Sequence, residues 1–361
     1  MTRVRSRGEL VRTFMLEHLD AHPRDIVRVT VERFQITRQA AHRHLHNLVN
    51  EKAVVSEGNT RNRVYRLAPL AEWGKLFPLT APMTEDSAWS EVGQQLGPLP
   101  ENVRDIWHYG FTEMFNNAID HSGATFAHVS MKKTAASTEI AIDDFGVGIF
   151  RKIQEALSLS DERHAVLELA KGKFTTDPKR HSGEGIFFTS RSFDDFRILS
   201  GRVFFSHDFG DEEDWILGGD DDPTIGTRVM MRLNNHTARS MPEVFDQYAD
   251  VDHGFTKTVV PVKLATYGDD NLVSRSQAKR LLARFDRFRT VVLDFAGIAT
   301  IGRAFADEVF RVFTNEHPNI LLQEIRTEPE VASMIAHART TLAAQGPGPD
   351  SEGVVREADK P

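Results

Sequence analysis

The chain has 361 residues, a formal charge of −8 at pH 7 and no cysteine. Its length allows two or three domains, and the lack of cysteine excludes disulfides, zinc–thiolate sites and a cysteine nucleophile. An apolar content of 40% and a charged content of 27% are ordinary for a globular protein. No apolar run approaches the ~20 residues of a membrane span, and the first dozen residues lack the apolar core of a signal peptide. We therefore expect a cytoplasmic protein without membrane contact.

Charge is distributed unevenly along the chain. Residues 1–68 contain 13 Lys and Arg against 7 Asp and Glu, a formal charge of +6, which leaves −14 for the remainder. A basic segment attached to an acidic body indicates a nucleic-acid-binding module joined to another function.

Residues 1–68 have the pattern of three helices followed by a hairpin. Helices are predicted at 10–19, 29–34 and 39–52, and Thr37 is the expected N-cap of the third. Strands at 54–56 and 61–67, joined by a turn, then form a hairpin with an arginine-rich outer face. This order resembles a winged helix-turn-helix, in which residues 38–52 are the recognition helix.

The polar side of the third helix and the hairpin predict contacts with double-stranded DNA. The apolar residues expected to face the core of this domain are Ala40, Leu45, Leu48 and Val49. The residues predicted to contact DNA are Arg38, Gln39, His42, Arg43, Arg61, Arg63 and Arg66. Those of the helix are expected in the major groove and those of the hairpin on phosphates. A small helical domain that binds protein or dimerises is the alternative, and the joint presence of a basic helix and a basic hairpin favours DNA.

The segment 107–122 is the most informative of the central region. Residues 69–95, which precede that region, contain Pro78 and Pro82 and few periodic apolar positions, so we interpret them as a linker with at most one short element. As a helix, 107–122 gathers polar side chains on one side, namely Glu113, Asn116, Asn117, Asp120 and His121. No Lys or Arg occurs between Arg104 and Lys132, so this face is suited to a hydrated metal ion beside phosphates.

Two glycine motifs follow this helix. Strands are predicted at 126–131 and 138–144, and the second ends in Asp144-Phe-Gly-Val-Gly148, where the backbone can approach a flat ligand. After a stretch rich in charge and glycine, His181-Ser-Gly-Glu-Gly185 enters a helix, and such a turn suits phosphate. We interpret Lys171 and Lys173, which precede it, as solvated loop charges. Further strands are predicted at 196–200, 203–207, 214–217 and 226–233.

These motifs occur in the order and approximate spacing of the Bergerat-fold (GHKL) ATPases. That superfamily includes gyrase B, the MutL mismatch-repair proteins, ATP-dependent chaperones and histidine kinases. Glu113-x-x-x-Asn117-x-x-Asp120 matches its first motif, and the later Gly226-Thr227 matches its last. The additional His121 and the Ser182–Gly185 turn resemble the anti-sigma-factor serine kinases most. The resemblance covers roughly residues 100–235, and four motifs in order favour a nucleotide site over a helix whose polar side packs on another domain.

The resemblance implies a role for each motif residue. Glu113 would orient or deprotonate the attacking water or hydroxyl, Asn117 would give an oxygen to Mg²⁺, and Asp144 would accept a hydrogen bond from the adenine amine. The other residues implied in the ATP site are Asp120, His121, Gly146, Gly148, Ser182, Gly183, Gly185 and Thr227. We interpret Asn116 and Asp143 as structural neighbours. A sensor histidine kinase is rejected, because residues 69–100 lack a helical hairpin with a phosphoacceptor histidine.

The last part of the chain predicts a small α/β domain. After a connector at 237–254, strands at 258–265, 290–295 and 320–325 alternate with helices at 274–288, 303–316 and 329–339. The run 292–308 resembles STAS domains of anti-sigma-factor antagonists, although Gly302-Arg-Ala304 stands where these antagonists carry a phosphorylatable serine. We therefore expect a docking domain without the usual phosphoswitch, and a disordered tail at 345–361.

The patterns together predict a multidomain α+β protein. Its parts are a winged helix (1–68), a linker (69–95), a Bergerat α/β sandwich that binds ATP (96–236), a connector (237–254) and a STAS-like α/β domain (255–344). We expect an ATP-binding, DNA-binding transcriptional regulator whose Mg-ATP site, with slow hydrolysis, switches DNA or partner binding. The alternatives are a serine/threonine protein kinase that acts on a separate STAS-like partner, and an adaptor that binds nucleotide without turnover. Expected partners are double-stranded DNA, ATP and a regulatory protein at the STAS-like domain; winged-helix proteins often form homodimers, but no segment identifies an interface.

Overall fold

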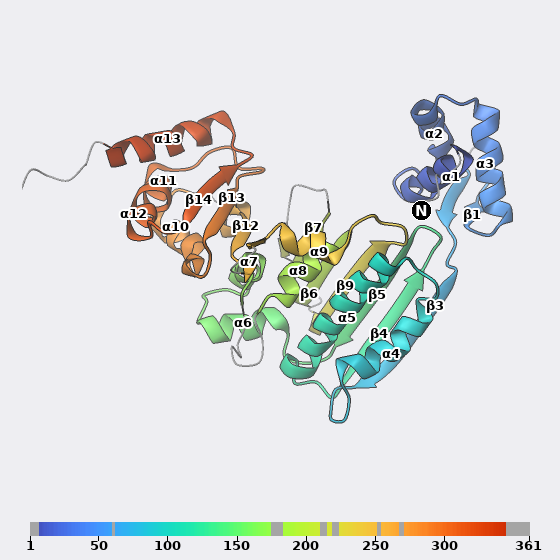
Figure 1. The fold of residues 1–361 in the computed structure, drawn as a ribbon, viewed down its shortest axis with the longest axis horizontal. Helices are drawn as coiled ribbons and strands as arrows, with labels where there is room; N and C mark the ends of the chain where they lie inside the picture. The colour runs from blue at the N-terminus through green and yellow to red at the C-terminus, as the bar shows by residue number, and fades with distance from the viewer. Residues whose placement is uncertain are drawn as a thin grey trace, which may run out of the picture. The chain divides into compact units, whose positions relative to one another are not determined.

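The computed structural model describes residues 7–59, 62–174, 183–209, 215–218, 224–250, 254–266 and 271–343 (Figure 1). The chain divides into two compact units, Met1–Gln247 and Tyr248–Pro361. Within the described ranges, no helix combines the length and the apolar character needed to cross a membrane.

The first unit begins with a three-helix domain and a hairpin, which we call the head. Its elements are α1 (Arg7–His18), α2 (Ile26–Phe34), α3 (Arg38–Asn50), β1 (Val54–Glu57) and β2 (Val64–Leu67), and the two strands pair antiparallel. Met15, Leu45 and Leu48 belong to its buried core. In α3 the buried alanine is Ala41, and Ala40, which we expected there, is only half-buried.

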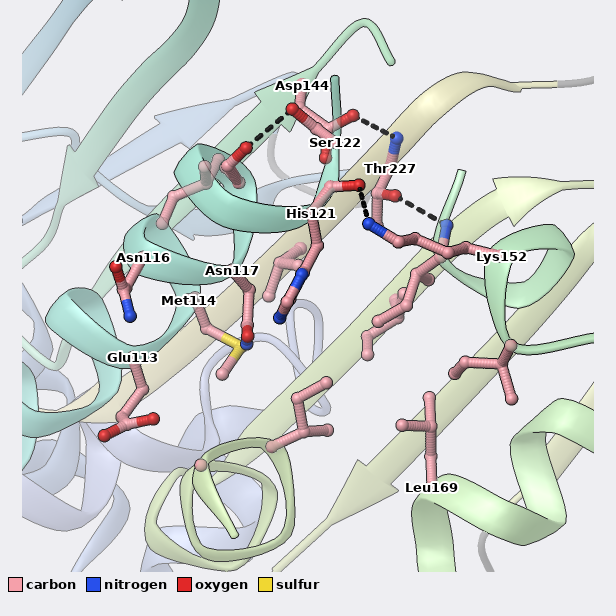
Figure 2. A pocket seen from close by; sticks show the side chains of 18 of the residues that line it. Glu113, Met114, Asn116, Asn117, His121, Ser122, Asp144, Lys152, Leu169 and Thr227 are labelled. Carbon is pink, nitrogen blue, oxygen red and sulfur yellow. Dashed lines mark hydrogen bonds between the residues drawn. The ribbon is translucent and has the colours of Figure 1, made fainter. Parts of the chain in front are cut away.

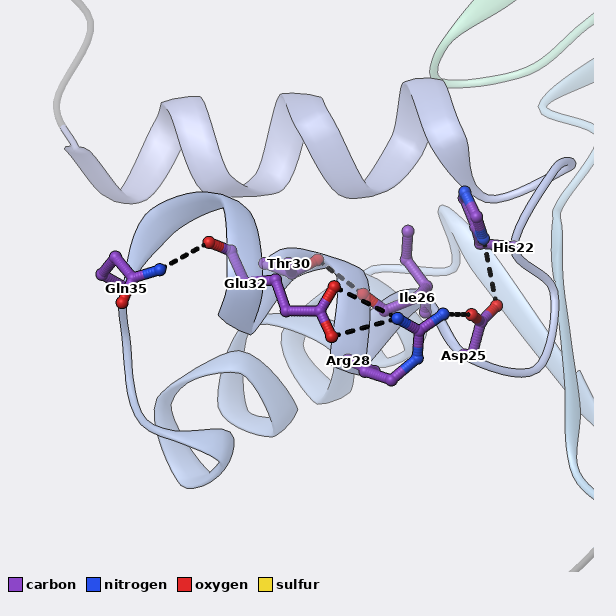
Figure 3. A network of polar contacts seen from close by, with 7 residues as sticks. All are labelled: His22, Asp25, Ile26, Arg28, Thr30, Glu32 and Gln35. Atoms are coloured by element: carbon purple, nitrogen blue, oxygen red, sulfur yellow. Dashed lines mark hydrogen bonds and ion pairs between the residues drawn. The ribbon is translucent and has the colours of Figure 1, made fainter.

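Helix α2 and the residues that flank it carry a network of polar contacts (Figure 3). Arg28 lies between Asp25 and Glu32, and its Nη1 donates to the Glu32 carboxylate at 3.0 Å. Pairs as exposed as these contribute little to stability. None of the seven residues in this network belongs to α3, so these contacts do not engage the α3 side chains predicted to bind DNA.

The centre of the first unit is a seven-stranded antiparallel sheet in the order β3-β4-β5-β9-β6-β7-β8. Its strands are β3 (Ala71–Pro78), β4 (Phe126–Lys133), β5 (Ser137–Asp144), β6 (Asp195–Gly201), β7 (Val203–Asp208), β8 (Trp215–Gly218) and β9 (Thr224–Asn234). The helices α4 (Glu85–Gln95) and α5 (Glu101–His121) lie along one face of this sheet (Figure 1). In this strand order, β9, the last of the seven strands in the sequence, occupies the middle of the sheet.

The segment 69–95, expected to be a linker, is instead part of the sheet layer, since it forms β3 and α4. The inward side chain of Phe77 packs edge-on against Phe115 of α5, with ring centroids 5.6 Å apart. The two prolines that indicated a linker are compatible with this structure, because Pro78 ends an edge strand and Pro82 lies between the two elements.

The charged stretch after the first glycine motif forms two helices that the sequence did not predict, α6 (Ile149–Leu157) and α7 (Arg163–Lys171). Lys171 is not a solvated loop charge. Its side chain is fully buried, and its Nζ lies 2.6 Å from Oε1 of Glu168. A buried cation is tolerated when a carboxylate pairs with it, which explains how a charged sequence forms an internal helix.

The connector expected at 237–254 contains a further helix, α9 (Met241–Asp246), and most of the small β10 (Ala249–Asp250) and β11 (Gly254–Phe255) pair. The glycine-turn helix is α8 (Gly185–Ser192). Helix α9 belongs to the first unit, and Phe245 on it packs against Phe188 of α8 with ring centroids 4.7 Å apart.

The second unit has a parallel sheet in the order β12-β13-β14. Its elements are β12 (Lys257–Pro261), η1 (Val262–Ala265), α10 (Arg275–Leu282), η2 (Phe285–Arg287), β13 (Thr290–Asp294), α11 (Arg303–Asp307), η3 (Glu308–Val312), α12 (Phe313–Glu316), β14 (Leu321–Ile325) and α13 (Pro329–Ala343). The strand expected to reach residue 265 ends at Pro261, and the helix expected to reach 288 ends at Leu282, since Arg284 adopts a left-handed conformation with φ +65°. The expected tail at 345–361 lies outside the described residues.

Candidate functional site

A cavity of about 370 Å³ lies between α5, α6, α8 and the sheet (Figure 2). The predicted site residues that line it are Glu113, Asn117, His121, Asp144, Gly148, Gly183, Gly185 and Thr227. Asn116, which we interpreted as a structural neighbour, also lines it, whereas Asp120 and Gly146 do not. Ser182 lies outside the described residues. Segments from residues 113 to 229 thus meet at one hollow.

Asp144 is fixed at one end of the cavity by the pairing of β5 with β9. Its Oδ1 accepts hydrogen bonds from the backbone N–H of Gly146 at 3.0 Å and of Thr227 at 3.1 Å. Burial raises the pKa of the Asp144 carboxyl, and the backbone hydrogen bonds offset part of this rise. The site therefore holds a buried acceptor whose orientation is set by two main-chain groups.

Two glycines near Asp144 are required by close packing rather than by a ligand. A Cβ at Gly146 would collide with the backbone of Ser122 at the end of α5, and one at Gly226, where φ is +73°, with the carbonyl of Asp144. Val147 N–H donates to Ser122 O at 2.9 Å in the same turn. Gly146, assigned to the ATP site by sequence, thus joins the Asp144 turn to α5 without facing the cavity.

Helix α5 presents Glu113, Asn117 and His121 to the cavity on successive turns (Figure 2). A spacing of four residues places neighbours about 6 Å apart along the helix axis. The opposite side of the helix is anchored by fully buried aromatic side chains, among them Trp107 and Phe111. The polar residues therefore form an ordered row along one wall, with His121 nearest the Asp144 end and Glu113 farthest from it.

The first turn of α8 borders the Glu113 end of the cavity. A Cβ at Gly185 would collide with the end of the Glu113 side chain, so a side chain at residue 185 would displace that carboxylate. Burial raises the pKa of the Tyr109 phenol, and the negative charges of Glu113 and Glu184 raise it further. Glu113 and Glu184 thus give this end of the cavity negative charge, which the positive end of the α8 dipole partly offsets.

Lys152 on α6 is a cavity residue that sequence reasoning missed. Its Nζ donates to the backbone carbonyl of His121 at 2.8 Å (Figure 2). Ile149 and Ile153 on the same helix line the cavity as well, and Ile149 N–H donates to Thr227 Oγ1 at 3.0 Å. The spacing of Ile149, Lys152 and Ile153 on one helical face was the signal that could have revealed this wall.

The cavity offers few protein ligands to a metal ion. Among the described residues, no group of three or more His, Asp or Glu side chains is arranged to hold one. The Asn117 carboxamide, which the sequence indicates as a Mg²⁺ ligand, is a neutral oxygen donor on the α5 wall. A Mg²⁺ ion at this wall would take most of its ligands from phosphates and water, which is how Mg²⁺ is commonly bound.

The head exposes its basic residues on α3 and the hairpin. The predicted DNA-contacting residues that the structure describes are all exposed: Arg38, Gln39, His42, Arg43, Arg63 and Arg66. Thr37 caps α3 as expected, accepting a hydrogen bond from Ala40 N–H at 3.2 Å. Arg66 lies 3.8 Å from the Glu57 carboxylate on the paired strand. Arg61 lies outside the described residues.

Residues 277–332, which span α10 to the start of α13, match a family model described as a STAS-like domain of unknown function (DUF4325). The C-terminal domain is STAS-like. No curated protein shows significant similarity to the chain.

In the STAS-like domain, Gly302 stands at the position where the sequence resemblance leads us to expect a phosphorylatable serine. Gly302 precedes α11, and its N–H donates to Leu272 O at 2.8 Å. A Cβ at Gly302 would lie 2.7 Å from Cα of Val273, which is too close for any side chain. The segment 272–273 therefore covers this position, and only glycine fits there.

Proposed function

We propose that the protein is a DNA-binding transcriptional regulator whose central domain binds Mg-ATP in a Bergerat-type site and uses it to switch DNA or partner binding. The observation that supports this most is the cavity in which the buried Asp144 carboxylate and the α5 row of His121, Asn117 and Glu113 converge. A buried carboxylate at one end can accept a hydrogen bond from the exocyclic amine of adenine. The α5 row leads from that end toward Glu113, along which the phosphates of a nucleotide would lie.

Each residue has a chemical role in this proposal. Asn117 would contribute an oxygen to Mg²⁺, which neutralises phosphate charge when bound. Glu113, about 6 Å further along the helix, would orient or deprotonate a water molecule. A retained base favours turnover over an adaptor that only binds nucleotide.

Contacts between the head and the sheet support a regulatory link. Asn234, at the end of β9, donates to Glu17 of α1 at 3.0 Å, and Ala135 in the β4–β5 turn packs against the core of the head. The other end of β9 carries Thr227, which lines the cavity. One strand thus contacts both the candidate nucleotide site and the candidate DNA-binding domain.

The deciding experiment measures the affinity of the full chain for a labelled duplex of mixed sequence at low salt, with and without Mg-ATP. We expect Mg-ATP to change the affinity in the wild type but not in Asn117→Ala. Arg43→Ala should weaken binding, and Arg28→Ala, an exposed cation of the α2 network, is the matched control. If the affinity of Arg43→Ala for duplex depends less steeply on salt concentration than that of the wild type, the lost contact is one to phosphate. Absence of binding to duplex at low salt would refute the DNA proposal, and an unchanged affinity on adding Mg-ATP would refute the switch.

A serine/threonine protein kinase that acts on a separate STAS-like protein is the second candidate. Glu113 on the cavity wall favours it, because a carboxylate can accept the proton of a substrate hydroxyl as well as that of water. The chain's own STAS-like domain carries Gly302 at the position where a phosphorylatable serine is expected, so the substrate would be another protein. Transfer of label from the γ-phosphate of ATP to a protein would favour this candidate over the regulator.

A further inference from the structure

Lys152 is the only ammonium or guanidinium group among the described residues that line the cavity, where two carboxylates, Glu113 and Asp144, also lie. A nucleotide brings several more negative charges into this partly enclosed space. Buried charges are tolerated when they are paired and hydrogen-bonded, so a protein cation would stabilise the charge of a bound nucleotide in addition to Mg²⁺. Lys152 is the residue of the cavity lining that can supply this cation.

The start of α6 fixes Lys152 against α5. Ile149 N–H is bound to Thr227 Oγ1 at 3.0 Å, and Lys152 N–H donates to Gly148 O at 3.1 Å, so the first turn of α6 is attached to β9 and to the glycine turn. From there the side chain reaches across to α5, and Nζ donates to His121 O at 2.8 Å (Figure 2). An ammonium has three N–H donors, and within the described part of the chain Lys152 uses one of them.

Burial lowers the pKa of Lys152, and the nearby Asp120 carboxylate counteracts part of this effect. The cost of burying this cation falls when an anion binds beside it. The environment of Lys152 therefore favours an anionic ligand, in agreement with its geometry.

The order of groups along α5 locates that anion. The Asp144 turn contacts Ser122 at the end of the helix. His121 comes next, and its carbonyl accepts the hydrogen bond from Lys152. Measured along the helix axis from His121, Asn117 lies about 6 Å away and Glu113 about 12 Å away. If adenine binds at Asp144 and Mg²⁺ at Asn117, the ammonium of Lys152 lies between the base and the metal. That interval corresponds to the ribose and the phosphate attached to it.

We propose that Lys152 binds the α-phosphate, the phosphate next to the ribose, of an adenine nucleotide. The assignment rests on the proposed nucleotide site and adds a residue that no motif contains. It implies that AMP, ADP and ATP share this contact and that adenosine lacks it. A charge-assisted hydrogen bond of this kind corresponds to roughly a 10- to 100-fold change in affinity.

The test is calorimetric binding of adenosine, AMP, ADP and ATP to the full chain, for the wild type and Lys152→Met. We expect AMP, ADP and ATP to lose affinity by a similar factor, and adenosine to be unaffected. Lys152→Arg should restore most of the loss. Arg151→Met, an exposed neighbour on α6 paired with Glu155 at 3.0 Å, is the matched control and should bind like the wild type. If Lys152→Met fails to fold in a thermal melt, Lys152→Gln, which keeps a donor for His121 O, replaces it.

Three outcomes would overturn the assignment. A loss confined to ATP would place Lys152 at the terminal phosphate, an equal loss for adenosine would mean that it supports the fold of the cavity, and no loss would exclude a contact. Each of these leaves the nucleotide site itself intact. Failure of the wild type to bind any of the four compounds would instead refute the proposed function.

Discussion

Two helices of this protein begin beside a glycine at which a Cβ would collide with a neighbour, but the neighbours differ in kind: a movable side chain at α8 and the backbone at α11. At α8, the Cβ of residue 185 would meet the Glu113 carboxylate on the cavity wall, whereas at α11 the Cβ of residue 302 would meet the backbone of Val273. The first helix start opens on a space that a ligand can enter. The second is covered by the chain itself, with Gly302 N–H already bound to Leu272 O. A glycine at a helix start is therefore evidence for an anion site only when the space before it is open.

The largest expected effect concerns the chemistry at the open helix start. Glu113→Gln should keep the affinity for Mg-ATP and lower the rate of ATP turnover by about 10²–10⁴-fold, the usual contribution of a general base. Steady-state phosphate release measures this, with Glu101→Gln, an exposed carboxylate of the same helix, as control. Unchanged turnover would remove Glu113 from the chemistry.

A methyl group at residue 185 should obstruct the open helix start. Gly185→Ala should weaken ATP binding by up to about 100-fold, because the new methyl group forces Glu113 or α8 to move and overpacking typically costs about 1–3 kcal/mol. Adenosine, held at the opposite end of the cavity, should bind as before. Titration with both ligands separates the two effects, and equal loss for both would contradict this view of the cavity.

A side chain at the covered helix start should instead reduce stability. Gly302→Ser should destabilise the protein by about 1–3 kcal/mol through its clash with Val273, without creating a phosphorylation site. Denaturant unfolding measures the change, and Ala304→Ser, exposed in the first turn of the same helix, should be close to neutral. A variant as stable as the wild type would show that segment 272–273 moves aside easily.

The smallest expected effect concerns pH. The pKa of Asp144 is raised by burial, so acidification should protonate it at a higher pH than an ordinary aspartate. A protonated carboxyl that has lost its charge is a poorer acceptor for adenine, so ATP affinity should fall as pH decreases through this raised pKa, by at most about tenfold per unit. Calorimetry between neutral and mildly acidic pH tests this, and Asp144→Asn should lack the acidic decline. The same shift makes the ligand-free protein gain stability as pH falls through that range, because the folded state then binds the proton more tightly.

The sequence predicted those parts of the fold in which local pattern and tertiary environment agree. Helix α5 has a continuous apolar side, and β4 and β5 alternate, so their positions followed from periodicity. The STAS-like domain was predicted from its alternating strands and helices and from the run 292–308, and the family match confirms it.

What the sequence could not predict depends on distant partners. Strand β3 is held by its pairing with β4 and by Phe77 against α5, neither of which leaves a local signal. Lys171 is buried because Glu168 lies one turn before it in a helix that is itself enclosed. The placement of Lys152 in the cavity depends on the hydrogen bond between Ile149 and Thr227, residues 78 positions apart. For β3 and Lys152 a contact between separate segments sets the result, and for Lys171 it is the enclosure of the whole α7 helix.

The central position of β9 has a consequence for how this protein is made. Strand β9 separates β3-β4-β5 from β6-β7-β8, and it is the last of these strands to leave the ribosome. Until residue 234 has been synthesised, neither β5 nor β6 can complete its pairing with β9, so each would present an unpaired edge, and such edges attract unwanted pairing. Thr227, whose backbone N–H donates to Asp144, arrives with the same strand. The candidate nucleotide site therefore cannot assemble before the sheet closes, and a ligand that binds there would select chains whose sheet is complete.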